Sequence, residues 1–486
     1  MANKTNTKTN TKTNTKINTK TANSKTANSK NATTSANTTL ATVASTTNND
    51  TPQIQQMPII PIISKAIRKT KKSSHKKELN MDNIEQYIYS NRFSHVYLYS
   101  EINNESIKEV RIAIDEANKS SNTDEVMTSP KGIVLHINSP GGAITSGIGL
   151  MRIVARSRVP IIVYIEGISA SAATFVSVLA KYRVIAPHAS ILIHQYASYA
   201  GGQRDELEFN RKVVEKMYSM MISLYRKHTK IPESYLNELL EHDLFLSPQL
   251  ALEYGLVDKI LVPQSSINIE KYFKLNPEYM LNKLIIDKKT NFNNIYLYGE
   301  SEGWFENNFS KSLNLTKQLS NIIQKHPIYK MSSRGSGSNN INNLNSITNK
   351  GGAKPIVIHI SDLGEFNNIY QILPIVNVLA LCPIPTICII DGPMNAICML
   401  IAIMCNKAYI YHYAFITMNF VNFGDHGTKI GDSLYNTKLF IGIIQNLLRT
   451  YTKLPAEIIN TILKKRYIFP ANKCVEYGIV DGILND

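Results

Sequence analysis

Cysteine is scarce in this chain of 486 residues, which contains only five. All five fall in the last third, mostly within apolar runs, and none forms a Cys-X-X-Cys pair. A disulfide framework or a cysteine-rich zinc site would need paired or regularly spaced cysteines. We therefore expect reduced, buried thiols, with no metal site and no cofactor. The five are Cys382, Cys388, Cys398, Cys405 and Cys474.

Long uninterrupted apolar runs are also missing. The best candidate, residues 372–405, is broken by Pro383, Pro385, Asp391 and Pro393, so no membrane span is predicted. No apolar segment of the signal-peptide type lies near Met1, which argues against secretion. The expected location stays open between the cytoplasm and an organelle, either a plastid or the mitochondrial matrix.

Acidic residues are nearly absent from the first eighty positions. Residues 1–80 contain fourteen Lys or Arg residues but only Asp50 and Glu78 as acids, so this stretch carries +12 of the formal net charge of +16. Its Thr-Asn-Thr-Lys repeats cannot bury apolar surface, so a disordered basic tail is predicted over residues 1–80. The remaining +4 is ordinary and indicates no nucleic-acid partner.

The tail has two interpretations. It is basic, rich in Ser and Thr and poor in acids, as organelle transit segments are. It is also poor in Arg and lacks amphipathic periodicity, which favours an Asn/Lys expansion without a targeting role.

From residue 81 apolar strands alternate with segments of helical spacing. This alternation predicts βαβ units and a largely parallel sheet, and therefore an α/β fold. The predicted strands cover 95–99, 133–137 and 160–167, and the predicted helices cover 105–117, 144–157 and 205–228.

Four segments of the first half recur in the same order in the second half. We interpret them as a tandem duplication, with domains over 81–262 and 294–486 joined by a linker over 263–293. A Ser/Gly/Asn-rich stretch over 331–353 is expected to be mobile. The recurring pairs are HVYLYSE (95–101) with NIYLYGE (294–300), IVLHIN (133–138) with IVIHIS (356–361), PIIVYIEG (160–167) with PTICIIDG (385–392), and LEYGLVDKI (252–260) with VEYGIVDGI (475–483).

Two predicted strands of the first copy end in turns suited to acyl transfer. One is followed by a Ser-Pro-Gly-Gly turn that ends at Gly142, and the other leads to Ser171 at the start of a helix. Turns of this kind can aim backbone N–H groups at an oxyanion. A serine nucleophile also needs an imidazole base and an acid that orients it, and His194 and Asp243 are the candidates.

Each of these residues also has an ordinary structural interpretation. A serine among alanines usually caps a helix, a histidine that ends an apolar strand usually belongs to the core, and an aspartate usually lies in a loop. Within the set, Ser169 competes with Ser171, while His188 and His242 compete with His194.

The surroundings favour the catalytic interpretation. Four segments, INSPGG, GISASAA, ASILIHQ and HDLFLSPQLALEYGLVD, resemble the Clp protease proteolytic subunit, ClpP, in order and spacing over about residues 85–262. The resemblance implies a ClpP/crotonase-like fold. It also implies that Ser171 is the nucleophile, His194 the general base and Asp243 the carboxylate that orients it. The backbone N–H groups of Gly141, Gly142 and Ala172 would form the oxyanion hole.

The resemblance further implies peptide hydrolysis through an acyl-enzyme. The substrates would be peptides or unfolded proteins, and the partners would be other ClpP-like subunits in an oligomeric chamber and an ATP-dependent AAA+ unfoldase. Two departures concern the site itself. Ala172 and Ala173 stand where the family has Met-Gly, and Tyr196 stands where it has Pro.

The second copy lacks the corresponding chemistry. Counting from the shared glycines puts Ala396, Asn419 and Arg466 at the three catalytic positions, and the Ser-Pro-Gly-Gly turn has become Asp-Leu-Gly-Glu, ending in Glu365. Cys398 is a nearby thiol without an aligned base. We predict an inactive domain with a structural or regulatory role.

Three other interpretations stay open. A non-catalytic scaffold subunit would have no physical need for Ser171, His194 and Asp243 together. A tandem protein of the signal-peptide-peptidase A type would divide a Ser/Lys dyad between its copies and usually carry a membrane anchor. A crotonase-type acyl-CoA enzyme would share the oxyanion turn without the triad.

Overall fold

The computed structural model describes residues 79–120, 132–195, 201–262, 293–298, 308–325, 355–363, 369–418, 420 and 430–485. We call 79–262 the first region and 293–485 the second region. The predicted tail and linker lie almost entirely outside the described residues, and the stretch 331–353 and Asn419 lie wholly outside them.

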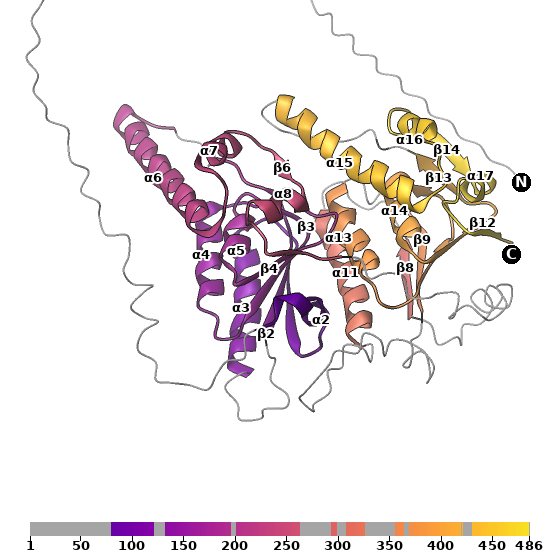
Figure 1. Ribbon diagram of the computed structural model, residues 1–486, viewed down its shortest axis with the longest axis horizontal. Coiled ribbons are helices and arrows are strands. Elements are labelled where there is room, and N and C mark those ends of the chain that lie inside the picture. Colours follow the sequence, from indigo (N-terminus) through magenta and orange to yellow (C-terminus); the bar gives the residue numbers. More distant parts are fainter. Residues whose placement is uncertain are drawn as a thin grey trace, which may run out of the picture. The chain divides into compact units, whose positions relative to one another are not determined.

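The first region is built on a seven-stranded sheet (Figure 1). Its main path runs β1-β2-β3-β4-β7 with parallel pairing, and a branch leads from β3 through β5 to β6, where the pairing is antiparallel. Every residue of β2 and β3 is buried, as expected for strands covered on both faces. The strands are β1 (Phe93–Leu98), β2 (Gly132–Ser139), β3 (Ile161–Ala170), β4 (Tyr182–Ile185), β5 (Ser190–Leu192), β6 (Phe245–Leu246) and β7 (Lys259–Ile260).

The helices of the first region connect these strands. Helices α3, α4 and α5 pack side by side, with α3 against β1 and α5 against β3. Ser247 caps α8 by accepting a hydrogen bond from the Leu250 N–H at 3.3 Å. The helices are the 3-10 turn η1 (Met81–Asn83), α2 (Glu85–Ile88), α3 (Asn104–Ser120), α4 (Ile144–Ala155), α5 (Ala173–Leu179), α6 (Arg204–His228), α7 (Glu233–Glu241) and α8 (Pro248–Glu253).

The second region contains a five-stranded parallel sheet in the order β15-β12-β10-β9-β8 and a small sheet in the order β11-β13-β14. In the small sheet β11 and β13 are parallel, and β13 and β14 are antiparallel. The strands are β8 (Asn293–Tyr298), β9 (Ile356–Ser361), β10 (Thr386–Ile390), β11 (Met394–Asn395), β12 (Lys407–Tyr411), β13 (Phe415–Met418), β14 (Tyr467–Pro470) and β15 (Gly482–Leu484).

The helices of the second region include α14, in which every residue is buried. None of the helices among the described residues is both long enough and apolar enough to cross a membrane. The helices are α11 (Asn308–Lys325), α13 (Ile369–Ala380), α14 (Ala396–Met404), α15 (Ile430–Tyr451), α16 (Ala456–Ile462) and α17 (Ala471–Glu476).

The two regions follow the same strand order. The path β1-β2-β3-β4-β7 corresponds to β8-β9-β10-β12-β15, and the branch through β5 and β6 corresponds to β13 and β14. The long strand β3 is matched by two shorter strands, β10 and β11. The predicted α/β class with parallel sheets is confirmed, while the duplication itself stays a prediction.

Helix α13 of the second region packs against β3 of the first. The Asn377 side chain donates to the Glu166 carbonyl at 2.6 Å, and the Asn138 side chain donates to the Tyr370 carbonyl at 3.2 Å. Gly167 leaves room first for the Asn138 side chain, whose Oδ1 a Cβ would meet most closely, and then for this helix, since the same Cβ would lie 3.0 Å from Cγ of Pro374. Backbone and side-chain polar groups of both regions therefore satisfy each other at this contact.

Candidate active site

Ser171 occupies a strained turn between β3 and α5. Its φ of 54° is the only positive value among the described residues other than glycine, and this conformation is costly for a side chain with a Cβ. The turn is held from two sides. The Ser171 N–H donates to the Leu192 carbonyl at 2.8 Å, and its carbonyl accepts from the Thr174 hydroxyl at 2.6 Å. Strain that is maintained in this way is typical of functional positions.

Strand register brings His194 next to Asp243. Strands β3 and β5 are parallel with Ala170 opposite Leu192, so Ser171 and His194 follow the same ends of neighbouring strands. Strands β5 and β6 are antiparallel with Leu192 opposite Phe245, and continuing this register sets Asp243 opposite His194.

The His194–Asp243 pair is short and partly accessible. Nδ1 of His194 lies 2.5 Å from Oδ1 of Asp243, and the side chains are 28% and 31% exposed. A carboxylate on Nδ1 makes that nitrogen the donor and leaves Nε2 available as a base. Among the hydrogen bonds of the described residues, none joins the Ser171 hydroxyl to His194. The structure thus brings His194 and Asp243 into contact, and it brings Ser171 to the neighbouring strand end.

The Ser-Pro-Gly-Gly turn lies directly against Ser171. Gly141 has a φ of 94° and Gly142 a φ of 142°, which glycine adopts far more readily than other residues. A Cβ at Gly141 would lie 2.6 Å from both the Ala170 carbonyl oxygen and Cβ of Ser171. Glycine is needed here both for its backbone conformation and for the close approach of the two turns.

Hydrogen bonds to the adjacent segment of this chain, residues 100–102, hold this turn in place. The buried Ser139 hydroxyl donates to the Ser100 carbonyl at 2.6 Å and accepts from the Gly141 N–H at 3.2 Å. The Ile102 N–H donates to the Gly141 carbonyl at 2.6 Å, and the Ala143 N–H donates to the Ile102 carbonyl at 2.8 Å. The turn is therefore a rigid extension of the sheet.

Ala172 is the N-cap residue of α5 and is fully buried. In the first turn of α5 the Thr174 N–H donates to the Ser171 carbonyl at 3.0 Å, and the Phe175 N–H donates to the Ala172 carbonyl at 3.3 Å. Gly147 of α4 accommodates the alanine, since a Cβ there would lie 3.0 Å from Cβ of Ala172. This contact gives a physical reason why an alanine fits at this position.

The competing residues lie in other environments. Ser169 is fully buried within β3, and its hydroxyl lies 3.5 Å from that of Ser177. Burial lowers the pKa of His188 to about 4, which disfavours its charged form. His242 does have a carboxylate partner, because its Nδ1 lies 2.9 Å from Oδ1 of Asp432 in the second region.

A buried polar cluster on β1, β2 and β3 was not predicted. His136 and Glu166 are fully buried and 2.9 Å apart, and the Tyr99 hydroxyl donates to the same carboxylate. His95 continues the chain, with its Nδ1 2.9 Å from Nε2 of His136. Burial, and then the neighbouring His136, lower the pKa of His95 to about 3. The sequence signal that could have revealed it is the recurrence of Tyr, His and an acid at matching positions of the recurring segments.

The positions of the second region that the sequence aligns with the catalytic candidates have different surroundings. Ala396 is buried at the first position of α14, directly after β11, as Ser171 directly follows β3. Arg466 is exposed just before β14, as Asp243 lies just before β6. Cys398 is fully buried, and its N–H donates to the capping Asn395 side chain at 2.9 Å. Asn419 and Glu365 lie outside the described residues.

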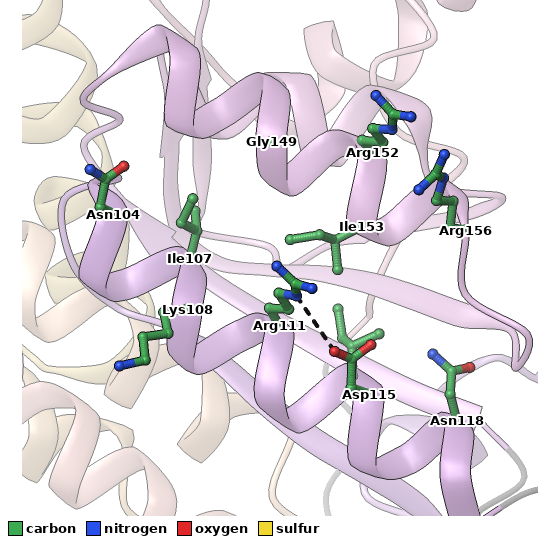
Figure 2. A pocket seen from close by; sticks show the side chains of 11 residues that line it. Asn104, Ile107, Lys108, Arg111, Asp115, Asn118, Gly149, Arg152, Ile153 and Arg156 are labelled. Carbon is green, nitrogen blue, oxygen red and sulfur yellow. Dashed lines mark ion pairs between the residues drawn. The ribbon is translucent and has the colours of Figure 1, made fainter.

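A cavity of about 580 Å³ lies between α3 and α4 (Figure 2). It combines an apolar floor with cationic side chains, and Arg111 forms an ion pair with Asp115 at 3.5 Å. None of Ser171, His194 and Asp243 lines it, so it is separate from the candidate active site. Within the described ranges, no group of three or more His, Cys, Asp or Glu residues is arranged to hold a metal ion.

Comparison with known proteins finds similarity over the first region. Residues 76–264 match the sequence profile of the family described as Clp protease. The chain is also 30% identical over 131 residues to the ATP-dependent Clp protease proteolytic subunit of Deinococcus radiodurans. That alignment covers 26% of this chain and 64% of the relative, which is less than two thirds of its length. The match over residues 76–264 therefore supports a Clp protease domain of the ClpP kind in this part of the chain.

Proposed function

We propose that the first region is a serine endopeptidase of the ClpP kind, with Ser171 as nucleophile, His194 as general base and then acid, and Asp243 as the carboxylate that orients His194. The proposal rests above all on the 2.5 Å contact between Nδ1 of His194 and Asp243. That contact leaves Nε2 available as a base, and His194 follows the strand end next to the one that Ser171 follows.

The reaction follows from these roles. Oγ of Ser171 attacks the peptide carbonyl carbon as Nε2 of His194 takes the hydroxyl proton, and a tetrahedral oxyanion forms. The Gly142 and Ala172 N–H groups stabilise that oxyanion, while the Gly141 N–H donates to the Ser139 hydroxyl and supports the turn. The C–N bond then breaks as His194 gives its proton to the leaving amine. Water, activated by His194, hydrolyses the acyl-enzyme, which releases the carboxylic acid and restores the Ser171 hydroxyl.

The second region is, in this proposal, an inactive copy that arose by tandem duplication. Three observations support it: the shared strand order, the four recurring segments and the replacement of Ser171 and Asp243 by Ala396 and Arg466. An alanine has no nucleophilic atom, and an arginine cannot accept the Nδ1–H of an imidazole.

The partners are also proposals. The relative from Deinococcus radiodurans is described as an ATP-dependent proteolytic subunit, which favours peptides or unfolded proteins as substrates and an AAA+ unfoldase that delivers them. Co-assembly with other ClpP-like subunits fits a chain that joins one complete and one degenerate site.

Labelling with a fluorophosphonate, followed by peptide mapping, tests the proposal, because the reagent forms a stable adduct only with an activated serine. We expect label at Ser171 and none after residue 293, with Ser171→Ala unlabelled. Native mass is measured on the same sample. An assembled protein that takes no label would favour the non-catalytic scaffold, and label at a different serine would overturn the assignment.

A further inference from the structure

We propose that two residues of the second region, Asp432 and Asn436, are positioning residues for the catalytic aspartate of the first. Both lie on α15, one turn apart, and both are almost fully buried, at 5% and 2% exposure. The inference rests on the proposed function, since it assigns the second region a task in the reaction of Ser171, His194 and Asp243.

The contacts are made to the backbone on either side of the Asp243 carboxylate. Oδ2 of Asp432 accepts from the Asp243 N–H at 2.9 Å. The Asn436 amide donates to the Asp243 carbonyl at 2.6 Å and accepts from the Phe245 N–H at 2.9 Å. Three hydrogen bonds from one helix therefore fix the peptide groups that carry the carboxylate.

The unpaired edge of β6 explains why an asparagine side chain suits position 436. Among the strands of the described residues, β6 pairs with β5 alone, so its other edge presents backbone N–H and C=O groups without a strand partner. The Asp243 carbonyl and the Phe245 N–H belong to residues two apart and therefore point to the same edge. An asparagine amide carries both a donor and an acceptor, so Asn436 satisfies both groups as a neighbouring strand would.

Packing along the same helix face completes the contact. Phe440 follows Asn436 by four residues, and its ring meets that of Phe245 edge-on at 5.2 Å between centroids. Tyr370 of α13 stacks on the same Phe245 ring at 5.6 Å. Helices α13 and α15 of the second region thus both pack against Phe245 of β6, two residues after Asp243.

The chemical consequence concerns His194. A general base must be held within a narrow range of positions, and a misplacement of about 1 Å can cost about 100-fold in rate. Asp243 is the partner that orients His194. The position of Asp243 depends in turn on β6, a strand of only two residues that follows it closely in the chain. Asp432 and Asn436 supply the rigidity that so short a strand lacks.

The test uses the full-length chain with Asp432→Ala, Asn436→Ala and the conservative Asp432→Asn. Leu434→Ala is the matched control, because Leu434 lies on the same helix between the two residues and is 57% exposed. We expect kcat to fall about 10- to 100-fold in both positioning variants with KM nearly unchanged. The rate of fluorophosphonate labelling at Ser171 should fall by the same factor. Asp432→Asn retains an acceptor for the Asp243 N–H and should recover most of the activity.

Hydrogen exchange of the segment 242–246 is measured on the same proteins. Both alanine variants should exchange faster there than the wild type, while Leu434→Ala should not. Wild-type kinetics in both variants, or unchanged exchange in 242–246, would overturn the inference. A wild-type protein that neither labels nor hydrolyses would instead contradict the proposed function, and the exchange result would still decide whether α15 fixes the Asp243 segment.

Discussion

The two regions carry the same polar cluster in two different settings. In the first, Tyr97 stacks on His136 with ring centroids 4.4 Å apart, and in the second Tyr296 stacks on His359 at 4.7 Å. Each histidine meets an acid, and each acid also accepts from a tyrosine, Tyr99 or Tyr298. Tyr99 is 3% exposed, however, whereas Tyr298 is 53% exposed.

The difference lies in what covers the two sheets. Helices α11 and α13 of the second region reach the cluster of the first, with Lys317 over the Tyr97 ring at 5.3 Å and Asn377 on the Glu166 carbonyl. Burial raises the pKa of Tyr99 well above its ordinary value, so this hydroxyl stays a donor. The cluster occurs in both regions, but only one carries Ser, His and Asp at the proposed catalytic positions. We conclude that the cluster serves the fold and the contact between regions.

The largest expected effect comes from replacing the proposed nucleophile, Ser171. Ser171→Ala should lower peptide hydrolysis about 10⁴- to 10⁶-fold, because Ala lacks the attacking oxygen. The reverse change, Ala396→Ser, should create no activity, since Arg466 occupies the position of the acid. Initial rates on a fluorogenic peptide measure both, with native mass as the control for assembly. Turnover in Ser171→Ala would refute the role of this serine.

The two clusters should differ in their contribution to stability. Glu166→Ala leaves His136 and Tyr99 buried without their acceptor and should lower the free energy of unfolding by about 3–5 kcal/mol. Asp391→Ala breaks the equivalent contacts where water has access and should cost about 1.5–3 kcal/mol. Denaturant unfolding of the two variants measures the difference. Equal losses would show that coverage by α11 and α13 does not matter.

The oxyanion turn can be tested against a glycine of the second region. Gly141→Ala forces a Cβ against Ser171 at a φ of 94°, so kcat should fall about 10²- to 10³-fold. Gly442→Ala in α15 is the control, because nothing lies within 4 Å of a Cβ there. That change should leave activity intact and stabilise the helix by about 0.5–1 kcal/mol. Similar kinetics in both variants would contradict the role of the turn.

A last expected effect concerns the dependence of stability on pH. The folded protein holds the pKa of His95 at about 3, below its ordinary 6.5, so the unfolded chain binds this proton more tightly. The stabilisation is complete above pH 6.5 and is lost as the pH falls from 6.5 toward 3. The second region has Asn294 at the matching position, so His95→Asn should flatten this dependence. Denaturation midpoints measured between pH 4 and 7 test it, and an unchanged slope in the variant would contradict it.

Much of the secondary structure could be predicted from local patterns. The helix predicted over 205–228 differs from the observed α6, Arg204–His228, by one residue at its start. The agreement is good because apolar periodicity is a local property. The strand predicted over 160–167 ended too early, since β3 continues to Ala170. Its last residues include Ser169, a polar residue that is buried although the apolar pattern gives no sign of it.

The sequence by itself determined the α/β alternation, the recurring segments and the candidate residues Ser171, His194 and Asp243. Only the tertiary structure decided that His194 and Asp243, 49 residues apart, form a hydrogen bond through the pairing of β5 with β6. It alone revealed Asp432, which lies 189 residues from the Asp243 that it contacts. The physical reason is that periodicity specifies each element locally. A hydrogen bond between distant segments depends on how the backbone brings their edges together.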